Sequence, residues 1–306
     1  MSTPSVVAVP PCGFSDLLDA AHRIDDEVAA RTGHPALGDA VWRDFAQPGP
    51  DSLGLLVDDI AFAHVARSDT FAPQHWTVGL ALTPGARRIA IAGTLIDAAV
   101  AHVAAHGGGN IVLWVFAATD EDDALLAPTG LKETRGLYEM RVPLPRPEPI
   151  EWPDGIEVRD FEPGRDEAAW LVVNNRAFEN HPDQGDWIEA TLARREAEPW
   201  FDPSIFVLAF DDEGLAGYNW CKIHPAEGDR PELGEIFVIG IDPRMTGKRL
   251  GRPLALEGLR RLAQRGLRTG SLFTASENTR AQKLYHDIGF TDHRIDRAYE
   301  RDVDPA

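Results

Sequence analysis

The chain has 306 residues, with 30 Lys and Arg against 49 Asp and Glu, and a formal net charge of −19. This length corresponds to about two domains, since domains cluster near ~100–150 residues. The negative charge argues against general binding of nucleic acid or anionic membrane. Two cysteines, Cys12 and Cys221, exclude a disulfide framework and a four-cysteine zinc site. Because no apolar run approaches about 18 residues and no signal-peptide pattern opens the chain, we expect a cytoplasmic protein with no membrane partner.

The first half is predicted to begin with helices and to continue with strands and helices in alternation. Apolar spacing predicts helices over 16–30, 36–46, 88–105 and 121–127, and strands near 53–57, 60–66, 76–83, 111–117 and 135–142. A proline-rich segment follows. Five prolines in the eleven residues 143–153 cannot sustain a helix or a central strand. The predicted domains are therefore 1–145 and 154–306, joined by a linker over 146–153.

The second half repeats the pattern of the first. It predicts helices near 164–178, 186–196, 251–266 and 278–287, and strands near 204–210, 215–223, 233–242, 270–275 and 290–300. Pro84 and Pro243 are 159 residues apart, and so are Gly130 and Gly289. Two anchors at one offset, with similar flanking patterns, indicate a duplicated α/β domain in which an antiparallel meander gives way to β-α-β units.

A basic loop leads from the strand near 235–242 into the helix near 251–266. Residues 244–268 hold eight basic side chains and one acid. Backbone N–H groups and the positive end of a helix suit a pyrophosphate, and Lys248, Arg249 and Arg252 add side-chain donors. The alternative is a basic helix face that balances acidic neighbours. No other phosphate motif is present, and the ten histidines show no metal-ligand spacing, so no metal is expected.

Two further residues are candidates for chemistry. Glu235 lies in an apolar strand, where a carboxylate is costly to bury, so it is either at an edge or placed for use. Tyr285 lies near the end of a predicted helix and is either a core residue or a proton donor. A thiol nucleophile formed by Cys221 and His224 is disfavoured, because residues three apart on a strand point to opposite faces.

The second half resembles the GNAT family of N-acetyltransferases, through the strand, basic loop and helix together with NTRAQKLYHDIGF (278–290). Four blocks give a narrower resemblance, to tandem GNAT enzymes of thiol biosynthesis: VNNRAFENHPDQG (173–185), EPWFD (198–202), WCKIHP (220–225) and LGEIFVIGIDP (233–243). The resemblance implies two tandem GNAT domains, each with a mixed central sheet flanked by helices. It covers about 140 residues of the second half strongly and the first half weakly.

The resemblance also implies a reaction. Acetyl-CoA, as cosubstrate, would acetylate the cysteine α-amine of a cysteinyl-glucosaminyl-inositol precursor by direct attack of the amine on the thioester. Glu235 would be the base, directly or through a water, and Tyr285 would protonate the leaving thiolate. The implied acetyl-CoA contacts are Ile239, Gly240, Ile241, Thr246, Gly247, Lys248, Arg249, Leu250, Gly251, Arg252, Asn278, Thr279, Arg280 and Lys283. The implied acceptor contacts are Asp39, Asp183, Lys222, Glu235 and Phe273.

Several residues depart from the family pattern. Arg249 replaces a glycine that allows the backbone to approach phosphate closely, so either Gly247 supplies that approach or the loop binds acetyl-CoA differently. Phe273 replaces a tyrosine, and Asp39 and Asp183 replace glutamates. In the first half, subtracting 159 from Glu235 gives Trp76, and the same step from Tyr285 gives Leu126.

We therefore expect the first half to be catalytically silent and to serve as scaffold and substrate wall of a monomeric enzyme. The alternatives are a tandem GNAT enzyme that acts on another small amine, and a non-catalytic acyl-CoA-binding protein.

Overall fold

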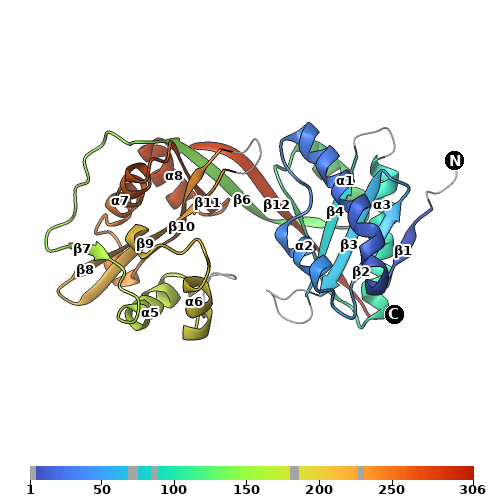
Figure 1. Ribbon diagram of the computed structural model, residues 1–306, viewed down its shortest axis with the longest axis horizontal. Coiled ribbons are helices and arrows are strands. Elements are labelled where there is room, and N and C mark those ends of the chain that lie inside the picture. The colour runs from blue at the N-terminus through green and yellow to red at the C-terminus, as the bar shows by residue number, and fades with distance from the viewer. Residues whose placement is uncertain (1–4, 68–74, 84–87, 180–185, 227–230) are drawn as a thin grey trace. The chain divides into compact units, whose positions relative to one another are not determined.

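A computed structural model describes residues 5–67, 75–83, 88–179, 186–226 and 231–306, with the side chain of Asp39 excepted. Contacts within the chain divide it into two compact units (Figure 1). Unit 1 comprises residues 1–137 and 294–306, and unit 2 comprises residues 138–293. This division differs from the predicted domains at two places. Residues 138–145 group with the second unit, and the last thirteen residues return to the first.

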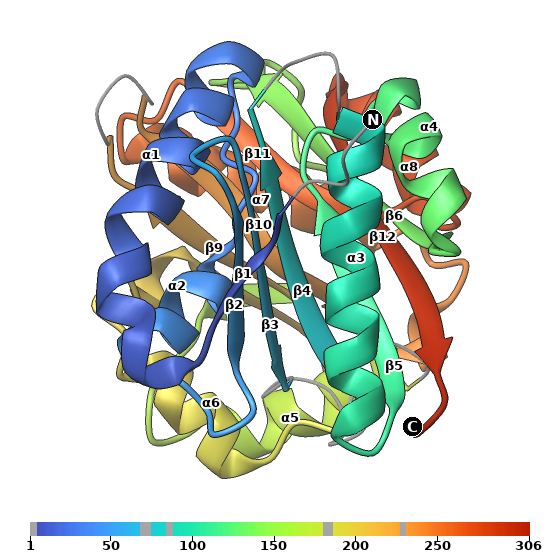
Figure 2. The same cartoon turned by 90° about the vertical axis from the view of Figure 1, so that its right-hand side faces the viewer.

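Unit 1 is built on a sheet with the strand order β1-β2-β3-β4-β5-β12. Its strands are β1 (Val7–Val9), β2 (Leu53–Val57), β3 (Ala61–Arg67), β4 (His75–Leu82), β5 (Gly109–Val115) and the C-terminal part of β12 (Thr291–Val303). Its helices are α1 (Phe14–Thr32), α2 (Asp39–Ala46), α3 (Arg88–Ala105) and α4 (Asp120–Leu126). Helices α1 and α2 lie on one face of β2–β4 and α3 on the other (Figure 2). β4 and β5 are parallel, and the pairs from β1 to β4 are antiparallel.

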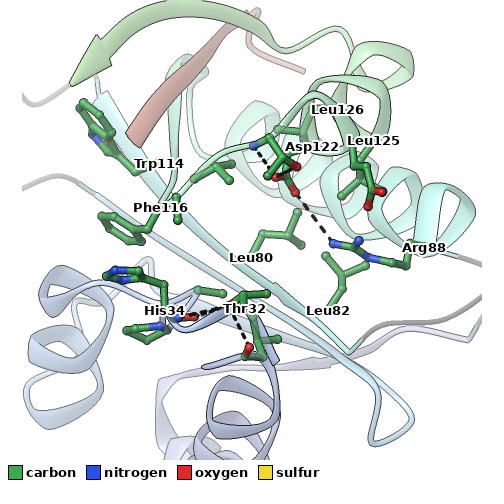
Figure 3. A pocket seen from close by; sticks show the side chains of 17 residues that line it. Thr32, His34, Leu80, Leu82, Arg88, Trp114, Phe116, Asp122, Leu125 and Leu126 are labelled. Carbon is green, nitrogen blue, oxygen red and sulfur yellow. Dashed lines mark hydrogen bonds and ion pairs between the residues drawn. The ribbon is translucent and has the colours of Figure 1, made fainter. Parts of the chain in front are cut away.

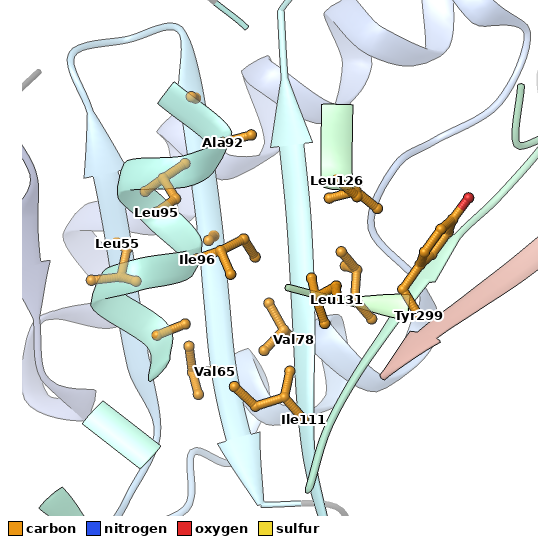
Figure 4. Packing of buried hydrophobic residues seen from close by; sticks show 14 of the residues in the cluster. Leu55, Val65, Val78, Ala92, Leu95, Ile96, Ile111, Leu126, Leu131 and Tyr299 are labelled. Atoms are coloured by element: carbon orange, nitrogen blue, oxygen red, sulfur yellow. The ribbon is translucent and has the colours of Figure 1, made fainter. Parts of the chain in front are cut away.

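The core of unit 1 lies between α3 and the sheet. The apolar face of α3, which includes Leu95, Ile96 and Ala99, packs against Val65 of β3 and Ile111 of β5 (Figure 4). The buried side chains of α3 recur three and four residues apart, as expected for one face of the predicted helix over 88–105. Among the described helices, α3 is the one long and apolar enough to cross a membrane by length and composition, and its apolar face belongs to this core.

Unit 2 repeats this plan, with the strand order β6-β11-β10-β9-β8-β7. Its strands are β6 (Lys132–Pro143), which enters from unit 1, β7 (Glu157–Asp160), β8 (Phe206–Asp211), β9 (Gly214–His224), β10 (Leu233–Ile241) and β11 (Thr269–Ala275). Its helices are α5 (Glu167–Ala177), α6 (Glu189–Glu196), α7 (Gly251–Gln264) and α8 (Thr279–Ile288). Helices α7 and α8 cover one face, and α5 and α6 the other (Figure 1). Strands β10 and β11 are parallel, as β4 and β5 are in unit 1.

The predicted elements agree with the structure to within a few residues, and the mixed sheet flanked by helices is confirmed in each unit. Two short strands, β1 and β7, were not predicted. Each has three or four residues at one end of the sheet order, too few for an alternating pattern to be recognised.

Candidate active site

Strand β10 contains a bulge at Phe237. Its register with β9 pairs Ile236 with Cys221 and Val238 with Trp220, so Phe237 is the extra residue. Before the bulge, Ile236 packs in the core under α7. After it, Phe237 and Val238 both pack in the core under α5. A bulge changes which face successive side chains point to and increases the local twist of the strand.

Beyond the bulge, β10 and β11 stop pairing. Their parallel register covers three pairs, of which the last is Ile236 with Leu272, although β10 continues to Ile241 and β11 to Ala275, all within the described part of the chain. β9 remains paired to β10 as far as Ile241, and its hydrogen bonds use every second set of N–H and C=O groups of β10. The other N–H groups of residues 237–241 therefore point toward the opening between β10 and β11.

Glu235 lies immediately before this opening, on the face that α5 covers. Its side chain is mostly buried, and Oε2 lies 2.5 Å from Nε2 of His224 on the adjacent strand. The His224 side chain is 40% exposed, so it joins the carboxylate to solvent. Sequence reasoning did not find this partner. Both strands were predicted, but the diagonal pairing depends on a register that the sequence pattern leaves open.

The predicted lysine lies on the same face. Lys222 is directly opposite Glu235 in the register, and its Nζ lies 4.8 Å from the ring centroid of Trp200 and 5.8 Å from that of Phe237. An ammonium over aromatic rings is attracted to their faces, so this geometry holds Lys222 near the carboxylate. Phe273, on β11, is 39% exposed.

The Cys221 thiol is excluded as a nucleophile with His224. Cys221 is fully buried in the core under α7, while His224 points to the opposite face, as predicted. Burial raises the pKa of the Cys221 thiol well above its ordinary value, so the thiolate is not available at neutral pH.

The loop between β10 and α7 turns sharply before the helix begins. Gly247 and Arg249 both adopt left-handed backbone conformations, with φ of +84° and +60°. Leu250 is buried and fastens the loop to the core, whereas Lys248 and Arg249 are exposed. Arg249 thus has a left-handed backbone conformation, which a glycine at this position would adopt at no steric cost. At the start of α7, Pro253 has no N–H and the N–H of Leu254 donates to the carbonyl of Leu250, so the N–H groups of Gly251 and Arg252 are the ones that can meet an anion.

Half of the basic cluster proves to be structural. Bases paired with carboxylates are Arg244 with Asp211 (2.8 Å), Arg260 and Arg261 with Glu257 (2.8 and 2.9 Å), and Arg265 with Asp202 (2.6 Å). The remaining bases, Lys248, Arg249, Arg252 and Arg268, have no carboxylate within 4 Å among the described residues. Of these, the first three lie on the loop and the first turn of α7. The positive charge open to a ligand is therefore smaller than the sequence suggested, and most of it is at the loop.

Helix α8 carries the remaining predicted contacts. Asn278 caps the helix, because its side chain accepts a hydrogen bond from the N–H of Ala281 at 3.1 Å. Arg252 donates to the carbonyl of Asp287 at 3.1 Å, and Nζ of Lys283 lies 3.4 Å from the carboxylate of Asp287. Thr279 and Arg280, at the start of the helix, are exposed. Arg252 thereby joins the first turn of α7 to the end of α8.

Tyr285 lies on the inner side of α8, in the core that also includes Ile236 and Leu272. The side chain is buried, its ring stands edge-on to Phe290, and burial raises its pKa to about 12. The phenol therefore remains protonated at neutral pH. Glu235 and Tyr285 approach the separating strands from opposite faces of the sheet.

Two predicted acceptor contacts cannot be located. Asp183 and the side chain of Asp39 lie outside the described residues, although Asp39 begins α2.

The corresponding strand of unit 1 has no bulge. β3 and β4 pair in continuous register from Ala61 to Arg67. Val112 of β5 corresponds to Ser271 of β11, because the two are 159 residues apart. Since Ser271 pairs with Glu235 and Val112 pairs with Thr77, Thr77 occupies in unit 1 the position that Glu235 has in unit 2. The predicted counterpart, Trp76, was wrong by the one residue that the bulge inserts. Neither residue is a carboxylate.

Unit 1 nevertheless retains an opening between its strands. The parallel pairing of β4 and β5 ends at Val78 and Leu113, and a cavity of about 310 Å³ lies beyond it (Figure 3). Leu80 and Trp114 line the cavity. Arg88, at the start of α3, faces Asp122 across it at 3.9 Å. The carboxylate of Asp122 thus forms an ion pair with Arg88, which would otherwise be available to bind an anion.

Comparisons with known proteins agree with this geometry. The acetyltransferase (GNAT) family profile matches residues 168–290. Among solved structures, a GCN5-related N-acetyltransferase from Sphaerobacter thermophilus is similar with a TM-score of 0.71 and 21% identity, covering 100% of this chain and 98% of that one. A tandem GNAT protein from the clavulanic acid biosynthesis pathway is similar with a TM-score of 0.66 and 16% identity, covering 99% and 100%. At these identities the likeness concerns the fold, which is the GNAT fold.

Sequence relatives give a narrower assignment. A mycothiol acetyltransferase from Thermobispora bispora is 41% identical over 260 residues, which are 83% of this chain and 85% of the relative. Another from Rhodococcus erythropolis is 35% identical over 294 residues, 94% of each chain. The match to the Rhodococcus erythropolis relative covers enough of the chain to include both units. The chain belongs to the mycothiol acetyltransferase family of GNAT enzymes.

Proposed function

We propose that this acetyltransferase moves the acetyl group of acetyl-CoA to the cysteine α-amine of cysteinyl-glucosaminyl-inositol, forming mycothiol and free CoA. The observation that carries the proposal is the Glu235–His224 pair placed beside the separating strands β10 and β11. A thioester that lies between these strands would meet Glu235 from one face and Tyr285 from the other.

The basic loop and the start of α7 would hold the phosphates of CoA. Between Thr246 and Arg252, the backbone N–H groups that the loop does not itself use would bind phosphate. Lys248, Arg249 and Arg252 would add cations that have no carboxylate within 4 Å in the described part of the chain. The pantetheine arm would continue beside Ile239 to Ile241, and Asn278 to Lys283 would line its other side. No metal takes part in this proposal.

The amine must be neutral to attack. Glu235 would accept the proton of the amine, directly or through a water. His224 contacts both Glu235 and solvent, so it would pass this proton on to solvent. As the N–C bond forms, the carbonyl oxygen gains charge, and N–H groups of residues 239–241 that β9 does not use would stabilise it. Collapse of the tetrahedral intermediate breaks the C–S bond and releases CoA as a thiolate.

Tyr285 would serve this leaving group. A phenol with a pKa of about 12 is a weaker acid than an ordinary thiol of pKa about 8.5. Complete transfer of its proton is therefore unfavourable, and we infer that Tyr285 donates a hydrogen bond to the departing sulfur. Lys222, Phe273, Asp39 and Asp183 would contact the acceptor.

Unit 1 would be catalytically silent. Its strand β4 has neither the bulge nor a carboxylate at Thr77, and Arg88 is already paired with Asp122. The unit would act as scaffold and substrate wall.

The test is an acetyl-transfer assay that follows free CoA and product mass. Release of CoA with the cysteinyl precursor, and not with generic amines, supports the proposal. Glu235→Gln should lower kcat by at least about 100-fold, in the range of lost general-base catalysis. The matched control Glu157→Gln removes an exposed carboxylate at the edge of the sheet and should leave kcat unchanged. Substantial turnover by Glu235→Gln would refute the assignment of chemistry to unit 2.

A further inference from the structure

A buried tyrosine packs against β10, the strand that carries the proposed N–H donors. Tyr218 of β9 lies directly opposite Gly240 of β10 and is fully buried. A Cβ atom at Gly240 would lie 2.5 Å from the nearest ring carbon of Tyr218 and 2.7 Å from its hydroxyl oxygen. The ring therefore occupies the space that a side chain at 240 would need and lies against the backbone of Gly240.

The hydroxyl of Tyr218 is held from the other side. It donates a hydrogen bond of 2.6 Å to Oδ1 of Asn174, which is fully buried on α5. Trp170, one helical turn earlier on α5, stands edge-on to the Tyr218 ring at 5.3 Å. Burial raises the pKa of Tyr218 well above its ordinary value, so the hydroxyl remains a donor throughout the working pH range.

Unit 1 provides an internal comparison. The residue 159 positions before Gly240 is Ala81, and its register partner on β3 is Phe62. Both are fully buried within an apolar cluster that also includes Phe14 and Leu17. The unit without the bulge and without the carboxylate thus also lacks the hydroxyl and the glycine. At these two positions unit 2, where the donor strand is proposed to work, has the tyrosine and the glycine, and unit 1 has Phe62 and Ala81.

We propose that Tyr218, held by Asn174, is a positioning residue that sets the place of residues 239–241 and so of the N–H groups that stabilise the carbonyl oxygen in the transition state. It does not touch the substrate. Donors of this kind act only when they stand within about 0.5 Å of the productive position, and a misplacement of about 1 Å can cost a factor of about 100 in rate. This inference rests on the proposed acetyl transfer.

The test compares three variants of the full chain at a temperature well below unfolding. Tyr218→Phe removes the hydroxyl and keeps the ring. Tyr218→Phe with Asn174→Leu removes both partners of this hydrogen bond, and with them the 3.1 Å donation from Nδ2 of Asn174 to Oδ1 of Asn175. Removing both partners of a buried hydrogen bond costs less stability than removing one. The control, Asp166→Asn, weakens the other end of α5, where Asp166 accepts from Arg159 at 2.5 Å and lies far along the helix from Asn174.

Tyr218→Phe should lower kcat about 10-fold or more, with both KM values and the Kd for CoA within about twofold of wild type. The double variant should recover melting temperature but not kcat. Asp166→Asn should lose stability and keep kcat.

A kcat within twofold of wild type in Tyr218→Phe, or an equal loss in Asp166→Asn, would overturn the inference while leaving the proposed function intact. Absence of acetyl transfer by the wild-type protein would refute both.

Discussion

Arg249 offers a test of how the loop binds phosphate, because its backbone and its side chain can be changed separately. Its φ of +60° is unfavourable for a residue with a Cβ, by about 1–2 kcal/mol. Glycine removes that strain but raises the entropy of the unfolded chain by the equivalent of about 0.4–1 kcal/mol. The difference predicts that Arg249→Gly leaves the free energy of unfolding unchanged or raises it by up to about 1.6 kcal/mol.

The effect on binding should have the opposite sign. A cation about 5 Å from one phosphate charge in water is worth about a fourfold change in affinity, and CoA presents more than one such charge. Arg249→Gly and Arg249→Ala should therefore both weaken CoA binding by about 3–10-fold in titration calorimetry. Arg249→Lys should stay within about twofold of wild type. The difference between wild type and Arg249→Ala should shrink in 1 M salt, where the screening length falls to about 3 Å.

The comparison between alanine and glycine isolates the backbone, because alanine retains the strain. Tighter binding of CoA by Arg249→Gly than by wild type would show that the arginine obstructs the loop. Unchanged binding by Arg249→Ala would show that its side chain does not meet phosphate. Either result would refute this reasoning.

Three other predictions test the two units and the leaving-group residue. In unit 1, burial raises the pKa of Asp44, but its hydrogen bonds outweigh burial and lower the pKa overall. The ionised Asp44 carboxylate therefore stabilises the fold above about pH 4, and this stabilisation is lost as the pH falls through the folded pKa. The difference in Tm between wild type and Asp44→Asn, measured by calorimetry from pH 7 to pH 3, should narrow at the acid end; a constant difference would contradict this. Gly258→Ala would place a Cβ 2.3 Å from Nδ2 of Asn219, and should lower the free energy of unfolding by about 1–3 kcal/mol in urea denaturation; no loss would show that α7 can move away from β9. Tyr285→Phe should lower kcat by about 10- to 100-fold with little change in KM for CoA, and an unchanged kcat would make Tyr285 a core residue alone.

The sequence was most informative where structure depends on near neighbours. The helix over 88–105 was predicted at its observed bounds, because a long alanine-rich apolar run there ends at the glycines that begin with Gly107. The paired bases on α7 could also have been found, since Glu257 stands three and four residues before Arg260 and Arg261, the spacing at which helical side chains meet. For these two bases the structure favours the alternative that the sequence left open, a basic helix face that balances acidic neighbours.

Features that depend on strand register were not predictable in the same way. The extra residue at Phe237 is invisible in an alternating pattern, and it shifted the comparison of the halves from Thr77 to Trp76. The contact between His224 and Glu235 has the same origin, because a shift of one residue would have placed them on opposite faces. The proposed contacts of acetyl-CoA, the cytoplasmic location and the monomeric state stay predictions.

The return of the last strand to unit 1 bears on how the protein is made. β5 finds its outer partner in residues 297–303, so the sheet of unit 1 is incomplete until nearly the whole chain has been synthesised. At about 5–20 residues per second, the ribosome needs roughly 10–30 s to pass from residue 137 to residue 303. Throughout that interval the edge of β5 is an open template for pairing with other chains. Unit 2, which is continuous in sequence, can be complete first. The half without the proposed chemistry therefore cannot complete its sheet until all of unit 2 has been synthesised.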